Sequence, residues 1–151
     1  TDNTDESNMA QPASANFLMD NALGANGFYG MFTILIHTDI AANADSDAVI
    51  ASAKSKSVPV ISAKQALDWV DGRDRSTFRN FSWNGSTVGF SINVGSGANG
   101  LRAMLPMTAN GKTLTSISRG GTNVPFTTQT IKGIGYAFFD AVAGGYSATY
   151  S

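Results

Sequence analysis

Residues 87–94 of the chain read Thr87-Val88-Gly89-Phe90-Ser91-Ile92-Asn93-Val94. Apolar residues occupy every second position, and small or polar residues occupy the positions between them. A period of two predicts a β-strand with one face in a core and the other toward solvent.

Turn signals recur on both sides of the strand. They are Asn-Gly or Gly-Gly pairs, which favour the positive φ angles of tight turns: Asn84-Gly85, Asn99-Gly100, Asn110-Gly111, Gly120-Gly121 and Gly144-Gly145. Between them the sequence predicts further strands near residues 77–83, 101–105, 112–118, 123–127, 134–140 and 146–150. So many short strands in one stretch are typical of an antiparallel β-sandwich, which we expect over residues 76–151.

The preceding part of the chain follows a helical period instead. Apolar residues recur every three to four positions and are flanked by capping residues, which predicts helices over 12–23, 46–56 and 63–71. Asp45 and Ser46 are candidate caps of the second helix. Ser62 and Gln65 form a capping box for the third, and Gly72 is expected to end it.

Two strand segments lie between these helices. Residues 28–37 are almost continuously apolar from Met31 to Ile36, a pattern typical of a parallel strand buried on both faces. Residues 58–61 predict a second, shorter parallel strand. The fold class is therefore α/β plus all-β: a frayed N-terminus over 1–11, a partial parallel α/β segment over 12–75, and the sandwich. Two parallel strands cannot complete a sheet, so we expect an upstream catalytic domain or a partner chain to cover this segment.

Composition excludes several classes of function. The net charge is -1 without any run of Lys or Arg, so a nucleic-acid or anionic-membrane partner has no electrostatic support. Cysteine is absent, which excludes disulfides, thiolate catalysis and cysteine metal sites. The longest strongly apolar stretch, about residues 30–36, is too short to span a bilayer. Few charges and much Gly, Ser, Thr and Asn favour an extracellular, secreted protein.

One run of the first part resembles a known family. Phe32-Thr33-Ile34-Leu35-Ile36-His37-Thr38-Asp39 is similar to the last conserved motif of the NodB-like polysaccharide deacetylases, a strand that ends in Leu-x-His or Leu-x-x-His. Residues 49–54 and 58–62 resemble the helix and final strand that follow it. The resemblance covers roughly residues 12–72, under half of the chain. In secreted multidomain bacterial proteins such a barrel end is often followed by a β-sandwich.

The resemblance implies a role for one residue, and it implies that the other residues of the family's active site are missing from this chain. His37 would be the general acid that protonates the leaving group, provided that an upstream barrel exists. The family also holds a metal such as zinc with an Asp and a His-x-x-x-His pair. His37 is the single histidine, so this chain alone carries no metal site, no cofactor and no complete active site.

Other residues are candidates for contact with a glycan, the partner that this family acts on. Trp83 shares a strand face with Phe81, and its ring could stack on a sugar or fill the core. Asp39 follows His37 closely. Trp69 is expected to pack at the junction with the sandwich, beside exposed carboxylates at Asp68 and Asp71. The alternating aromatic residues of the last two strands are expected in the core: Tyr136, Phe138, Tyr146 and Tyr150.

Three hypotheses about function follow. The leading one is an accessory C-terminal region of a secreted polysaccharide-acting protein, which binds glycan or braces the catalytic domain. The second is the C-terminal part of an active deacetylase with His37 as its acid. The third is a structural or adhesion β-sandwich without a ligand, which a core that encloses every large aromatic ring would favour.

Overall fold

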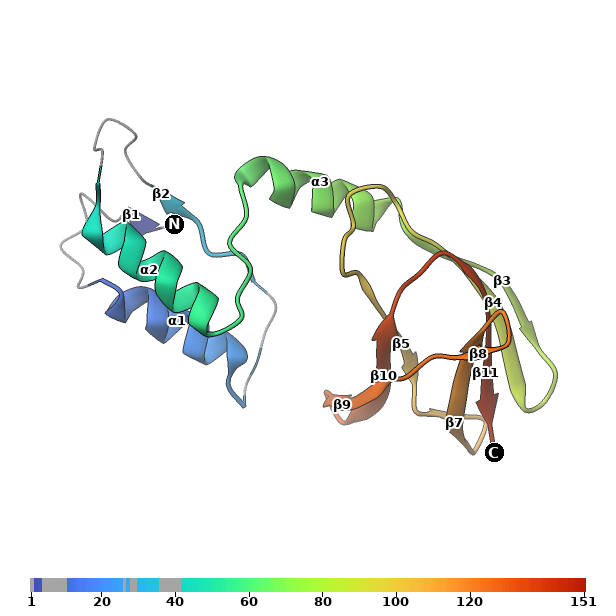
Figure 1. The fold of residues 1–151 in the computed structure, drawn as a ribbon. Coiled ribbons are helices and arrows are strands. Elements are labelled where there is room, and N and C mark those ends of the chain that lie inside the picture. Colours follow the sequence, from blue (N-terminus) through green and yellow to red (C-terminus); the bar gives the residue numbers. More distant parts are fainter. Residues whose placement is uncertain (1, 4–10, 26, 28–29, 36–41) are drawn as a thin grey trace. The chain divides into compact units, whose positions relative to one another are not determined.

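The computed structural model describes residues 2–3, 11–25, 27, 30–35 and 42–151. The chain divides into two compact units, residues 1–61 and 62–151, which we call the helical unit and the strand unit (Figure 1). It is thus a mixture of helices and strands. His37, Asp39 and parts of the predicted strand 28–37 lie outside the described residues.

The helical unit contains two helices that contact each other, α1 (Ala13–Leu23) and α2 (Ala44–Ser55) (Figure 1). Lys56 Nζ lies 2.5 Å from Asp20 Oδ1 across this contact. The buried hydrophobic residues in the described part of this unit are Met19, Val49 and Ala53. The core that these residues form is small.

The described residues of the helical unit contain one short parallel pair of strands. β1 (Asp2–Asn3) pairs with β2 (Ile34–Leu35), with Asp2 opposite Ile34. The predicted strand at 58–61 is wrong, because these residues form no ladder and Val60 and Ile61 are exposed. Pro59 has no N–H to donate to a ladder, which weakens the segment as a strand.

Local capping places the start of α2 two residues earlier than predicted. Asn43, rather than Asp45 or Ser46, is the N-cap, and its side chain accepts a hydrogen bond of 3.0 Å from the backbone N–H of Ser46. The aspartates at 45 and 47 then lie in the first turn, where the helix dipole favours negative charge.

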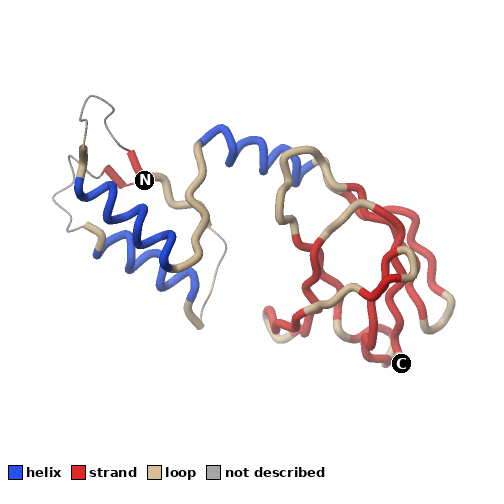
Figure 2. The backbone as a smooth tube through the Cα atoms, in the orientation of Figure 1, coloured by secondary structure: helices blue, strands red, loops and turns tan. Residues whose placement is uncertain are grey.

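The strand unit begins with helix α3 (Ala63–Asp74), and strands follow it toward the C-terminus (Figure 2). These nine strands form antiparallel pairs. One sheet has the order β3-β4-β11-β7-β6, with β8 also paired to β7; the other has the order β5-β10-β9. The strands are β3 (Thr77–Trp83), β4 (Thr87–Asn93), β5 (Arg102–Pro106), β6 (Thr108–Ala109), β7 (Lys112–Arg119), β8 (Thr122–Asn123), β9 (Thr127–Ile131), β10 (Ile134–Asp140) and β11 (Gly144–Tyr150).

Both sheets contribute to one core. Phe90, Ile92, Ile117 and Tyr150 come from the larger sheet, and Phe139 comes from the smaller one. Phe139 and Ile117 have no exposed surface. The predicted core position of Tyr146 and Tyr150 is confirmed by this cluster.

β10 presents its aromatic residues differently from the prediction. Tyr136 is only half-buried, and Phe138 is buried outside the main cluster, beneath the Arg102 guanidinium at 5.9 Å. Phe139, which alternates with them, occupies the core instead. The outer side of this small sheet is therefore also partly apolar.

Most predicted strands and turns agree closely with the observed ones. Gly144 and Gly145, which the sequence predicts as a turn, are instead the first two residues of β11. The sequence predicts a single strand over residues 123–127, but β8 ends at Asn123 in the larger sheet and β9 starts at Thr127 in the smaller one. Pro125 lies between them. A proline cannot donate to a ladder, which suits the point where the chain leaves one sheet for the other.

Helix α3 belongs with the strands, which differs from the predicted boundary at residues 72–76. The capping box of Ser62 and Gln65 is present as predicted, but the helix continues through Gly72 to Asp74. A Cβ at position 72 would lie 2.5 Å from the backbone N of Ala98 and the backbone O of Ser96. Gly72 therefore permits close helix–loop packing rather than ending the helix.

Candidate functional site

The most prominent exposed apolar feature of the strand unit is a set of three rings on β3. Phe78 is 39% exposed, Phe81 63% and Trp83 39%. We call Phe78, Phe81 and Trp83 the aromatic face. β3 is the end strand of its sheet and pairs with β4 alone, which explains why these rings keep contact with water.

A break in register brings the three rings to one side of β3. Phe78 is opposite Ile92 and Trp83 is opposite Val88, but the pairing shifts between Arg79 and Ser82. Asn80 has a φ of 56° at this irregularity. Strict alternation would place Phe78 on the opposite side from Phe81 and Trp83. The extra residue of the bulge is therefore what brings all three rings to the same side of the strand.

The aromatic face continues the side of the sheet that faces the core. Ile92, the cross-strand neighbour of Phe78, is a core residue, and Val88 packs against the core. The ring centroids of Phe78 and Phe81 lie 5.6 and 6.1 Å from that of buried Phe90, and the Trp83 ring lies 5.7 Å from that of Tyr150. No residue of β3 belongs to the core cluster. The buried neighbours thus hold the rings in place, and the outer surfaces of the rings stay accessible.

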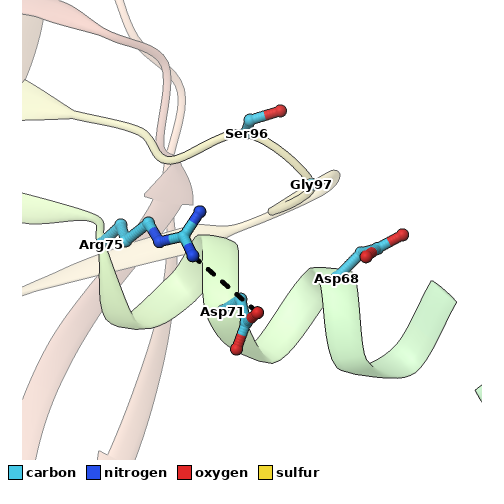
Figure 3. Close-up of a pocket in the computed structure, with 5 residues that line it drawn as sticks. All are labelled: Asp68, Asp71, Arg75, Ser96 and Gly97. Atoms are coloured by element: carbon cyan, nitrogen blue, oxygen red, sulfur yellow. Dashed lines mark ion pairs between the residues drawn. The ribbon is translucent and has the colours of Figure 1, made fainter. Parts of the chain in front are cut away.

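A second, polar hollow lies between α3 and the loop before β5. Asp68, Asp71, Arg75, Ser96 and Gly97 line a space of about 280 Å³. Figure 3 shows Asp71 of α3 and Arg75, the residue that follows this helix, directed toward each other; their charged atoms are 3.9 Å apart. Asp68 binds Lys64 at 2.6 Å on the same helix.

Glycines and two hydrogen bonds fix the loop over the helix. A Cβ at Gly97 would lie 2.4 Å from the backbone O of Asp68, and Gly97 also has a φ of 93°. Ser76 Oγ donates to the Gly72 carbonyl at 2.8 Å and accepts from the Gly95 N–H at 2.9 Å. The polar hollow is therefore held by tightly packed backbone.

Trp69 has a structural position. Its indole N–H donates to the backbone carbonyl of Asn99 at 3.0 Å, and the residue is half-buried. Trp69 was expected to pack at the junction with the strands, and its observed partner lies in the loop between β4 and β5. Asp68 and Asp71 are exposed, as expected.

The structure thus brings one predicted binding residue, Trp83, together with Phe81 as foreseen. It adds Phe78, whose place on this side depends on the bulge. Asn adopts positive φ more readily than most residues, so Asn80 was the sequence feature that could have indicated the bulge. Sequence reasoning also missed Arg75, Ser96 and Gly97, since the loop meets α3 only through tertiary packing. His37 and Asp39 lie outside the described residues.

Neither a metal cluster nor a membrane-spanning helix occurs in the described part of the chain. There, no three His, Cys, Asp or Glu side chains gather into a group that could hold a metal ion. Within the same residues, no helix combines the length and apolar character needed to cross a bilayer.

No family model matches the chain, and neither a curated protein nor a solved structure matches it with significance.

Proposed function

We propose that the strand unit is a glycan-binding module that serves a secreted polysaccharide-acting protein. The observation that carries the proposal is the aromatic face, three large rings that share one side of an edge strand and are each more than a third exposed. Exposed rings cost free energy in water, about 25 cal/mol per Å² of apolar surface. Rings that a core does not need are therefore candidates for ligand contact.

Carbohydrate recognition needs both an apolar surface and polar groups. The C–H faces of a sugar ring pack against aromatic rings, and its hydroxyls bond to carboxylates, amides and guanidinium groups. Phe78, Phe81 and Trp83 supply the first requirement. The polar hollow has a carboxylate and a guanidinium at Asp71 and Arg75, and Arg75 precedes β3 by two residues. We assign the hollow a secondary role in binding hydroxyls.

Rigidity of the rings supports the same function. Phe78 and Phe81 stack with centroids 6.0 Å apart, and Phe90, which both contact, stacks on buried Tyr146 at 5.2 Å. Side chains that are ordered before binding lose less conformational entropy when a ligand arrives. The third hypothesis, a module without a ligand, predicts that every large aromatic ring is enclosed. Trp83 and Phe81 are exposed, which argues against it.

Binding to polysaccharides tests the proposal. The full chain is incubated with insoluble cellulose, chitin and xylan, and then titrated with soluble oligosaccharides of the material that retains it. Trp83→Ala and Phe81→Ala are each expected to weaken binding about tenfold, because a stacked ring contributes about 1.5 kcal/mol. Met104→Ala is the matched control, since Met104 is 47% exposed but lies on the other sheet.

The outcomes separate the hypotheses. Equal loss in the Met104 variant would mean that the aromatic face is not the binding surface. Absence of binding to every polysaccharide and to a glycan array would remove the binding function and leave the bracing function. Bracing has its own structural support, because Gly72, Gly95 and Gly97 let α3 pack tightly against the loop between β4 and β5.

The larger protein is a further part of the proposal. We propose that the two sheets form a β-sandwich, which their common core supports, and that residues 12–72 complete a NodB-like barrel. The parallel pairing of β1 with β2 is the structural feature in favour of this second part, whereas residues 58–61, the expected final strand of the barrel, form no ladder. Reading the coding sequence upstream tests it: a His-x-x-x-His pair would make His37 the candidate acid of a deacetylase, and the lack of such a pair would end that hypothesis.

A further inference from the structure

The free edge of β9 differs from the other sheet edges. β3 carries a bulge and Arg79, β5 contains Arg102 and Pro106, and β6 and β8 have two residues each. Bulges, charges, prolines and shortness all discourage the addition of another strand. β9 reads Thr-Thr-Gln-Thr-Ile, has none of these devices, and is exposed at all five positions.

The turn after β9 shows which backbone groups face outward. Lys132 and Gly133 both have positive φ, 51° and 80°, and Ile131 is opposite Ile134, so they form a two-residue hairpin turn. Ile131 and Ile134 are therefore a hydrogen-bonded pair. From there, non-hydrogen-bonded and hydrogen-bonded pairs alternate along the two strands. Gln129 bonds to β10, whereas the N–H and C=O groups of Thr128 and Thr130 point away from it. In the described part of the chain these groups have no backbone partner.

We propose that β9 pairs with β9 of a second copy of this chain. An antiparallel pair about a two-fold axis at Gln129 places Thr128 opposite Thr130 of the other copy. Both residues have outward backbone groups, so two such pairs form four hydrogen bonds in one register. The three-stranded sheets of two copies would then join into one continuous sheet.

The side chains of β9 favour a second copy over a foreign peptide. The strand has no charged residue, so pairing with itself brings no like charges together. Thr127 is placed opposite Ile131, and the Gln129 amides meet at the axis. Lys132 is placed opposite Phe126 of the other copy, so the two copies of Lys132 do not face each other. A charged peptide would find no complementary charge among the residues of this strand.

A charge exchange at the axis tests the interface. Sedimentation velocity of the full chain is expected to give about twice the 15.8 kDa chain mass at high concentration. Gln129→Lys and Gln129→Glu alone are each expected to halve that mass, because like charges meet across the axis, and their mixture is expected to restore it. A monomeric wild type, or a Gln129→Lys variant that stays dimeric, would overturn the proposal.

A cross-link tests the register in the same full-length protein. The chain has no cysteine, so Gln129→Cys introduces a unique thiol at the axis. The α-carbons of directly opposite residues in a non-hydrogen-bonded pair lie about 4.5 Å apart, within reach of a disulfide. Mild oxidation is expected to give a covalent dimer for Gln129→Cys and not for Ser116→Cys, an exposed control on β7. Equal cross-linking of both variants, or none at position 129, would contradict the register.

Discussion

The two units of the chain differ most in how they bury apolar surface. In the strand unit, residues from both sheets enclose Phe139, Ile117 and Ala148 completely. The described residues of the helical unit bury Met19, Val49 and Ala53, while Phe17 and Leu23 of α1 stay exposed. The strand unit therefore contains most of the hydrophobic stabilisation of the described chain.

The difference in buried core determines which unit can support a binding surface. A surface that binds a ligand needs a rigid support, and the aromatic face rests on buried Phe90 and Tyr150. The exposed apolar residues of α1 rest on a far smaller core. We therefore assign binding to the strand unit and expect the helical unit to be the less stable of the two.

The largest effect is expected from the core of the strand unit. Phe139→Ala removes a ring with no exposed surface and is expected to lower the free energy of unfolding of this unit by about 3–5 kcal/mol. Urea denaturation followed by tryptophan fluorescence measures it, because both tryptophans lie in this unit. Phe81→Ala, at an exposed ring, is expected to cost about 0.5–1 kcal/mol. Val49→Ala in the helical unit should leave this transition unchanged, and a shift in it would show that the stability of the strand unit depends on the helical unit.

Gly72→Ala tests whether α3 belongs to the strand unit. Alanine is about 1 kcal/mol better than glycine inside a helix, so an isolated α3 would be stabilised. Here the new Cβ would meet backbone atoms at 2.5 Å, and we expect a net loss of about 1–3 kcal/mol from the strand unit. Gly145→Ala is the control, because its Cβ would meet nothing within 4 Å and its backbone has no positive φ. Stabilisation by Gly72→Ala would show that α3 does not pack in the strand unit.

A smaller effect is expected from the Tyr150 hydroxyl, which donates to the Pro106 carbonyl at 3.0 Å. Tyr150→Phe is expected to cost about 1–2 kcal/mol at neutral pH, because that acceptor loses its partner. Burial raises the pKa of Tyr150 above its usual value. Above pH about 10 the unfolded chain loses this proton while the folded protein keeps it, so wild-type stability falls as the pH rises. The gap between wild type and Tyr150→Phe should therefore narrow there, and a constant gap would contradict the assignment.

The smallest effects are expected from the two helix caps, one in each unit. Ser62→Ala and Asn43→Ala each remove an N-cap hydrogen bond worth about 1 kcal/mol. Ser62→Ala should lower the unfolding free energy of the strand unit. Asn43→Ala should increase hydrogen exchange in α2 alone. A loss of strand-unit stability in the Asn43 variant would show that the units unfold together.

Much of the fold could be predicted from local patterns. The alternation around Phe90 identified β4, and the Asn-Gly and Gly-Gly pairs located most turns. The capping box at Ser62 identified the start of α3. These features depend on neighbours within a few residues, so a single sequence is enough to recognise them.

The errors have tertiary causes. Gly72 has the usual residue type of a helix end, but the loop at residues 96–98 uses it for close packing. Phe78 reaches the aromatic face only because Asn80 adopts a left-handed conformation within the bulge. Arg75 joins Ser96 and Gly97 in the polar hollow through the same packing of α3. None of these contacts leaves a periodic signal in the sequence.

Native-state hydrogen exchange on the full chain tests the central comparison most directly. We predict that amides of β4, β7, β10 and β11 exchange only through global opening of the strand unit, and that the central amides of α3 share that slow opening. The amides of α1 and α2 are predicted to exchange much faster. Protection of α1 and α2 equal to that of the strands, or exchange of α3 at the rate of α2, would contradict the division of stability between the two units.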